Sequence, residues 1–136
     1  MPDNPAGVEL EIPPGSAYVG VARLALAALA RKAGFDEEAI DDLRIAVSEA
    51  CTNAVLSHEQ AGTDQPIGID WREEDARVIV EIHDRGAAFD PTSLDVSDTQ
   101  GMRLSMSIAL LESLVDECDF SSRDDGGMST RLVIAR

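Results

Sequence analysis

The sequence predicts an α/β fold of the α+β kind, a two-layer sandwich in which a mostly antiparallel sheet carries three helices on one face. Segments of alternating apolar and polar residues, typical of half-buried strands, occur singly or as hairpin pairs. Long Ala- and Leu-rich segments with helical spacing lie between them. The 136 residues fit the size of one domain, so we expect 1–136 to form a single domain.

The first half of the chain contains one strand and two helices. Apolar residues alternate with glutamates over 8–12, and the Pro-Pro-Gly that follows ends this strand. We expect Ser16 to cap a helix over 18–32. We expect Asp36 to cap a second helix that continues to about residue 57. The two helices are expected to form one layer of the sandwich.

The second half contains two hairpins separated by a helix. Residues 67–83 form two alternating segments around a polar turn, which predicts a hairpin. A loop over 84–99 leads into a helix over 104–115. A second hairpin is predicted between residues 117 and 135, with its turn at the Arg-Asp-Asp-Gly-Gly segment.

The charge of the chain restricts its partners. A formal net charge of −15, from 26 acidic and 11 basic residues, repels nucleic acid and anionic membrane surfaces. The longest apolar stretch, 19–30, is interrupted by Arg23 and falls short of the roughly 20 residues of a membrane span. We therefore expect no nucleic acid and no membrane as partner, and a protein with a basic face fits better.

The chain ends and the cysteines indicate the compartment. The first residues lack the basic and apolar regions of a secretion signal, so we expect a cytoplasmic protein. Cys51 and Cys118 lie in no metal-binding pattern and are expected to be buried thiols. His58 and His83 share no ligand spacing with them and are expected at the surface or at a pocket rim.

The predicted second helix carries the most informative polar residues. Glu49 and Asn53 lie one turn apart on the flank of its apolar stripe. This spacing lets a carboxylate and an amide oxygen face a hard cation together, with the carboxylate able to take a proton from a hydroxyl. The alternative is a solvated helix flank, although asparagine is a weak helix former that needs another reason in mid-helix.

A second candidate site lies at the end of the strand before residue 84. Asp84 can accept a hydrogen bond from an exocyclic amine, and Gly86 lets the backbone pass close to a planar ring. Taken alone, the Asp-Arg-Gly segment is also compatible with an ordinary turn, which is the favoured interpretation of an isolated motif.

Three segments together resemble a known family. Ser-Glu-Ala-Cys-Thr-Asn-Ala-Val (48–55) looks like its N-box, Asp-Arg-Gly-Ala-Ala-Phe-Asp (84–90) like its first glycine box, and Leu-Val-Asp-Glu (114–117) like the end of its second glycine-box helix. The family is that of the anti-sigma-factor serine/threonine kinases, within the GHKL (Bergerat-fold) ATPase superfamily of gyrase B, Hsp90, histidine kinases and MutL. The resemblance covers nearly the whole chain. It implies an anti-sigma factor that binds a sigma factor and phosphorylates a STAS-type anti-anti-sigma protein with Mg-ATP.

The resemblance also implies roles for individual residues. Glu49 would be the general base toward a substrate serine, and Asn53 would bind the Mg²⁺ that bridges the ATP phosphates. Asp84 would take the adenine amino group, with Gly86 giving room at the ring. Arg103 would contact phosphate, where charge neutralisation is needed.

Two further implications concern the surface of the protein. Arg23 matches an arginine that relatives use to contact partner proteins. The alternative for Arg23 is a stem that lies over apolar surface with its head in water. Whether the chain forms a homodimer, as relatives do, stays open.

The sequence departs from the family at the expected phosphate site. Ser105 and Ser107 stand where the second glycine box has glycines, and we expect them beside the phosphates at the start of a helix. A left-handed backbone there would cost a non-glycine residue about 1–2 kcal/mol and weaken ATP binding. An active kinase and a nucleotide-impaired pseudokinase that serves as a partner-switching module are therefore both compatible with the sequence, and a generic acidic adaptor is disfavoured by the ordered motifs.

Overall fold

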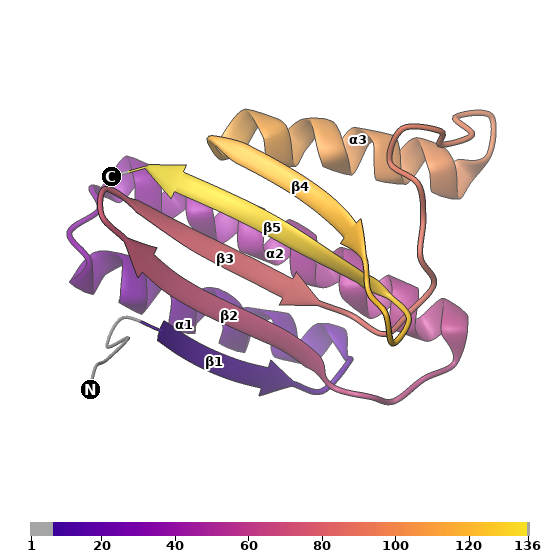
Figure 1. Cartoon of the computed structure of the whole chain (residues 1–136), viewed down its shortest axis with the longest axis horizontal. Helices are drawn as coiled ribbons and strands as arrows, with labels where there is room; N and C mark the ends of the chain where they lie inside the picture. The colour runs from indigo at the N-terminus through magenta and orange to yellow at the C-terminus, as the bar shows by residue number, and fades with distance from the viewer. Residues whose placement is uncertain (1–6, 136) are drawn as a thin grey trace.

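A computed structural model describes residues 7–135 of the chain (Figure 1). The elements are β1 (Gly7–Ile12), the short 3₁₀ helix η1 (Ser16–Tyr18), α1 (Val19–Lys32), α2 (Glu37–Ala61), β2 (Ile67–Glu74), β3 (Arg77–His83), α3 (Thr99–Leu114), β4 (Glu117–Ser122) and β5 (Met128–Ala135). The strands form one antiparallel sheet in the order β1-β2-β3-β5-β4. The three α-helices lie on one face of this sheet, which confirms the predicted sandwich.

The beginning of each helix depends on its capping. Asp36 caps α2, because its Oδ1 accepts a hydrogen bond of 2.8 Å from the backbone N–H of Ala39. Ser16 does not cap α1: residues 16–18 form a 3₁₀ turn of their own, and no side chain caps the helix that follows. That prediction was wrong, whereas the Asp36 cap is confirmed. α2 is also longer than predicted and ends at Gly62, which has a φ of 69°.

α3 begins earlier than the sequence indicated. It starts at Thr99 rather than at residue 104, since the side chain of Asp98 accepts a hydrogen bond of 3.2 Å from the backbone N–H of Gly101. The predicted loop is correspondingly shorter. Arg103, expected before the helix, therefore lies inside it, and Ser105 and Ser107, expected at its start, lie further along it.

The core fills the space between the sheet and the helices. Trp71 is buried at 1% exposure, and Cys51 in α2 is buried with it. Burial raises the pKa of the Cys51 thiol to about 12 and that of the half-buried Cys118 to about 11, so both thiols are protonated at neutral pH. In the described part of the chain, none of the helices is long and apolar enough to cross a membrane.

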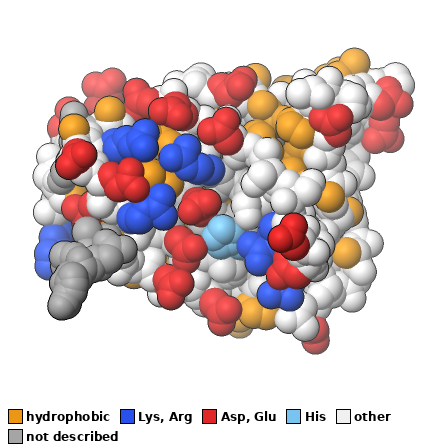
Figure 2. Space-filling view, in the orientation of Figure 1, with side chains coloured by type: hydrophobic (Ala, Val, Ile, Leu, Met, Phe, Trp, Pro, Cys, Tyr) orange, Lys and Arg blue, Asp and Glu red, His pale blue; other side chains and the backbone are white. Residues whose placement is uncertain are grey.

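Among residues 7–135, no helix lies on the opposite face of the sheet (Figure 1). Figure 2 shows this face: acidic and basic side chains alternate over the strands, and a histidine lies near the centre. The two faces of the sheet therefore differ in chemistry, because successive residues of a strand point to opposite sides.

Candidate functional site

A narrow cavity of about 60 Å³ lies between α2, α3 and the end of β3. Asn53 from α2, Arg103 from α3 and Asp84 at the end of β3 all line it. Phe89 and Phe120 form another part of the wall, with ring centroids 5.6 Å apart. The fold thus brings together three side chains that are far apart in the sequence and that the sequence analysis selected separately.

Asn53 is the centre of the polar contacts in this cavity. Its Oδ1 accepts a hydrogen bond of 2.7 Å from Nη1 of Arg103, and its Nδ2 donates one of 2.7 Å to Oγ of Ser107. Ser107 is 4% exposed. These contacts explain why a weak helix former occupies mid-helix in α2, and they join α2 to α3. No local sequence pattern predicts the contact between Asn53 and Ser107, because the two residues meet only in the folded chain.

Asp84 is a buried hydrogen-bond acceptor at the cavity wall. It is 7% exposed, and its Oδ1 accepts bonds from the backbone N–H groups of Gly86 (3.0 Å) and Met128 (3.1 Å). Desolvation raises the pKa of this carboxyl above its ordinary value, although the two backbone donors act against the rise. A buried carboxylate with one oxygen held in this way is suited to accept a further hydrogen bond from a ligand amine.

Replacing Asp84 by asparagine is expected to raise stability most at neutral and alkaline pH. The raised pKa means that the folded state binds the proton more tightly than the unfolded state. The wild type therefore gains stability relative to the variant as the pH falls through the folded-state pKa. Urea unfolding of both proteins at about pH 4.5 and about pH 7.5 measures the difference. A difference that stays constant or grows toward acid would contradict this account of Asp84.

Gly86 and Gly127 are required by close packing. A methyl group on Gly86 would overlap the Ser57 side chain and lie 2.5 Å from its carbonyl carbon, so the glycine makes room for α2. This packing requirement is separate from the predicted role, room for a planar ring, which stays a prediction. Gly127, which the sequence analysis did not select, has a φ of 87°, and a methyl group there would overlap the backbone carbonyl of Asp84.

Glu49 and Arg23 do not line this cavity. Glu49 is half-buried one turn before Asn53 on α2 and does not line the cavity. Nη1 of Arg23 donates a hydrogen bond of 3.2 Å to Oγ of Ser48, the residue before Glu49. One nitrogen of the Arg23 guanidinium is thus bonded to α2, and the predicted contact with a partner protein stays a prediction.

Ser105 and Ser107 do not have the backbone that was predicted for them. Both lie within α3, and among the described residues the only non-glycine residue with a positive φ is Asp75. The predicted left-handed strain is therefore absent. The glycine at the junction of loop and helix is Gly101, where a methyl group would overlap the backbone carbonyl of Asp95. Its position three residues after the capping Asp98 was the available sequence signal.

His58 is buried, contrary to the surface or rim position expected for it. It is 1% exposed, and its Nε2 accepts a hydrogen bond of 2.8 Å from the backbone N–H of Arg85. Its Nδ1 has no partner among the described residues. The imidazole thus joins the end of α2 to the turn that follows β3. His83 is half-buried on the helix-free face of the sheet.

Comparisons with known proteins agree with this geometry. The histidine kinase-like ATPase domain family matches residues 12–134. The serine-protein kinase RsbW of Listeria monocytogenes is 34% identical over 119 residues, which cover 81% of this chain and 76% of that protein. RsbW of Bacillus subtilis is 32% identical over 126 residues, which cover 86% of this chain and 79% of that protein.

Two solved structures share the fold. The RsbU and RsbW domains of Rv1364c from Mycobacterium tuberculosis match with a TM-score of 0.71 and 21% identity, over 95% of this chain and 32% of the mycobacterial chain. The SiaB–SiaC complex from Pseudomonas aeruginosa matches with a TM-score of 0.69 and 14% identity, over 93% of this chain and 88% of the other. At these identities the likeness shows the fold alone.

Proposed function

The chain belongs to the histidine kinase-like ATPase family, in the group of the anti-sigma serine-protein kinases, and from this membership we propose how its site works. The proposed activity is the transfer of phosphate from ATP to a serine of an anti-anti-sigma protein. The observation that carries the proposal is the meeting of Asn53, Asp84 and Arg103 at one cavity. The carboxylate of Asp84 suits the amino group of adenine, and the amide oxygen of Asn53 suits a metal ion. The guanidinium of Arg103 suits phosphate.

Two residues of the cavity wall suit the two ends of a nucleotide. Asp84 would accept a hydrogen bond from the adenine amino group through its buried carboxylate. Arg103 would bind phosphate through charge-assisted hydrogen bonds from its guanidinium. It is half-buried on α3 and already aimed at the cavity, so little side-chain freedom is lost on binding.

Asn53 fits the role of a Mg²⁺ ligand. Its Oδ1 is a hard, neutral oxygen donor at the cavity, and a carbonyl oxygen has a second lone pair beside the one used by Arg103. The ion, when bound, neutralises the charge of the phosphates. Ser107 holds the amide of Asn53 so that the oxygen and not the nitrogen faces Arg103.

Glu49 is proposed to take the proton of the substrate serine. Because it lies outside the cavity wall, one turn from Asn53, the substrate hydroxyl would approach from the surface of α2. Arg23 lies over the same part of α2 through its bond to Ser48. Val21 and Leu24, which are 54% and 65% exposed, lie near it on α1. We assign this surface of α1 and Arg23 to the protein partner.

The proposed partners are a sigma factor and a STAS-type anti-anti-sigma protein. The net charge of −15 favours a partner with a basic face and disfavours nucleic acid. A homodimer is a further assembly that the family membership suggests.

The cavity must widen before a nucleotide can bind. Its volume of about 60 Å³ compares with roughly 300–1,000 Å³ for ordinary ligand pockets. The connection between β3 and α3 forms one wall through Phe89, which packs on Phe120. Movement of this connection would open the site.

A pseudokinase is the alternative function. It is favoured by the fact that the side-chain oxygen and the side-chain nitrogen of Asn53 both already have partners within the chain.

Calorimetric titration with ATP and Mg²⁺ tests the proposal. We expect saturable binding by the wild type. Replacing Arg103 by alanine is expected to weaken binding about 10- to 100-fold, because a charge-assisted hydrogen bond contributes about 1.5–3 kcal/mol. Arg31→Ala is the matched control, since that arginine pairs with Glu37 on the surface at the far end of α1. Absence of binding at millimolar ATP in the folded wild type would leave the pseudokinase as the function.

A further inference from the structure

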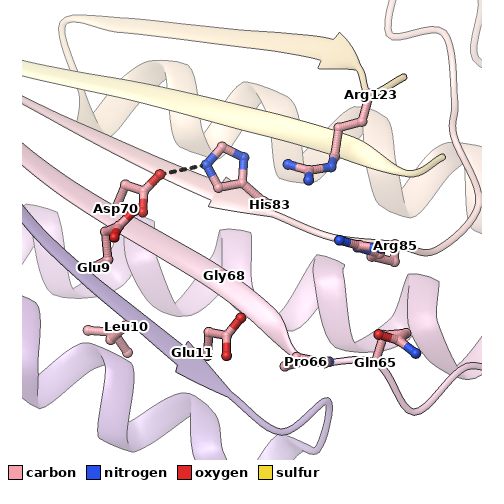
Figure 3. Close-up of a pocket in the computed structure, with 10 residues that line it drawn as sticks. All are labelled: Glu9, Leu10, Glu11, Gln65, Pro66, Gly68, Asp70, His83, Arg85 and Arg123. Carbon is pink, nitrogen blue, oxygen red and sulfur yellow. Dashed lines mark hydrogen bonds and ion pairs between the residues drawn. The ribbon is translucent and has the colours of Figure 1, made fainter. Parts of the chain in front are cut away.

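The helix-free face of the sheet carries a row of three carboxylates. Glu9 on β1 lies directly opposite Asp70 on β2, and Asp70 lies directly opposite Glu81 on β3. Figure 3 shows Glu9 beside Asp70. Like charges directly opposite each other on neighbouring strands are destabilising. Among the described residues, guanidinium groups lie at the Glu81 end of the row: Nη1 of Arg72 is 3.8 Å from Glu81, and Arg131 on β5 is directly opposite Glu81.

A histidine completes this group. Nε2 of His83 lies 2.9 Å from Oδ2 of Asp70, as the dashed line in Figure 3 shows. The other ring nitrogen, Nδ1, lies 2.7 Å from Oγ of Ser129 on β5. One ligand atom from each of Asp70, Glu81 and His83 lies within 4.8 Å of the others. The imidazole is thus fixed by a partner outside the group, with its second nitrogen aimed at the carboxylates.

We propose that Asp70, Glu81 and His83 form a binding site for a divalent transition-metal ion of the zinc class. An imidazole nitrogen with carboxylate oxygens suits this class, whereas Mg²⁺ and Ca²⁺ prefer oxygen alone. Zinc lies about 2.0–2.2 Å from such ligands, so two ligand atoms that share the ion lie at most about 4.4 Å apart. The side chain of Glu81 is 27% exposed and can make the small adjustment that this requires.

Ser129 is the positioning residue of the proposed site. Histidine ligands commonly donate their second N–H to a neighbouring oxygen, which fixes the tautomer that binds the metal. The hydroxyl of Ser129 is placed to accept that bond from Nδ1 of His83, which leaves Nε2 as the ligand. Three protein ligands leave a further coordination position for water or another ligand. Asp70 and His83 also line the groove in Figure 3, where Gly68 has no side chain.

The proposed ion explains why three carboxylates and a histidine lie together on a face of the sheet that takes no part in the proposed nucleotide site. Without an ion, His83 contacts Asp70 and Nη1 of Arg72 lies 3.8 Å from Glu81 in this row of three aligned carboxylates. A dication between Asp70, Glu81 and His83 would add charge neutralisation at Asp70 and Glu81 together. The site lies on the opposite face of the sheet from the cavity of Asn53, so its test needs no nucleotide and is independent of the proposed kinase activity.

The test is calorimetric titration of the whole chain with Zn²⁺, followed by the absorption spectrum of the Co²⁺ complex. We expect one ion to bind per chain, with a cobalt spectrum that lacks a thiolate charge-transfer band. Ser129→Ala keeps all three ligands and is expected to weaken zinc binding about tenfold or more. His83→Gln and Asp70→Asn, which each remove a ligand, are expected to weaken it further.

Two control variants separate this site from other metal binding. Glu117→Gln removes a carboxylate on β4 that lies outside the group and is expected to leave zinc affinity unchanged. Cys118→Ser removes the less buried thiol and should also have no effect. Loss of binding in Cys118→Ser, equal affinities of the wild type and the folded His83→Gln variant, or no binding at submillimolar zinc would each overturn the proposal.

Discussion

Replacing Glu49 by glutamine is expected to lower the rate of phosphate transfer about 10²- to 10⁴-fold, the contribution that a positioned general base typically makes. ATP affinity should change little, because Glu49 does not line the cavity that holds the proposed nucleotide contacts. The measurement is transfer of labelled phosphate from ATP to a STAS-type antagonist from the same organism. It is paired with a calorimetric ATP titration of the same variant.

The matched control for this prediction is Glu59→Gln. Glu59 is exposed and lies more than two turns after Glu49 on the same helix. It changes the net charge by the same amount without approaching Asn53. We expect wild-type transfer in this control. Equal transfer by the wild type and Glu49→Gln would remove Glu49 from the role of base, and equal loss in both variants would point to charge and not to proton transfer.

Replacing Gly127 by alanine is expected to lower the free energy of unfolding by about 2–5 kcal/mol. A φ of 87° costs a non-glycine residue about 1–2 kcal/mol, and forcing a methyl group into packed structure adds about 1–3 kcal/mol. The atom that a methyl group would overlap is the backbone carbonyl of Asp84, so relief requires movement of the cavity wall. Urea unfolding measures the loss, and ATP titration measures the effect on the site.

Gly126 provides a control one residue away. It has a φ of 91°, yet a methyl group there would meet no atom within 4 Å. Gly126→Ala should therefore cost only the backbone strain, about 1–2 kcal/mol, and leave ATP affinity unchanged. If the two alanine variants lose the same stability, the close approach of Gly127 to Asp84 is not a constraint on the fold.

Glu49, Asn53 and Asp84 could be singled out from the sequence because they are informative residue types at fixed spacing, whereas Arg103 was chosen from the resemblance to a family. Glu49 and Asn53 are four residues apart on a helix with a clear apolar stripe, and Asp84 ends a strand with clear alternation. The start of α3 could not be found in this way. Its first turn, Thr-Gln-Gly-Met-Arg, has no apolar periodicity, and the cap by Asp98 alone extends the helix to Thr99.

The error over Ser105 and Ser107 followed from that boundary. Placed at a helix start, they would have needed an unusual backbone; placed inside α3, they adopt an ordinary one. Ser107 then faces α2 and binds Asn53. His58 was misplaced for a different reason, since a single polar residue near a helix end gives no sign of what will cover it. In the fold, the turn after β3 covers it and Arg85 donates to its ring.

The sequence by itself determined the α+β class, the strand and helix order and the Asp36 cap, and it singled out Glu49, Asn53 and Asp84 as candidates, because these follow from periodicity, capping and motif spacing along the chain. Only the tertiary structure decided that Asn53 lies between Arg103 and Ser107, that Gly127 packs on Asp84, and that His83 meets Asp70 on the other face of the sheet. Each of these contacts joins residues from separate elements. Their existence depends on strand register and helix packing, which the whole core fixes together and no local pattern specifies.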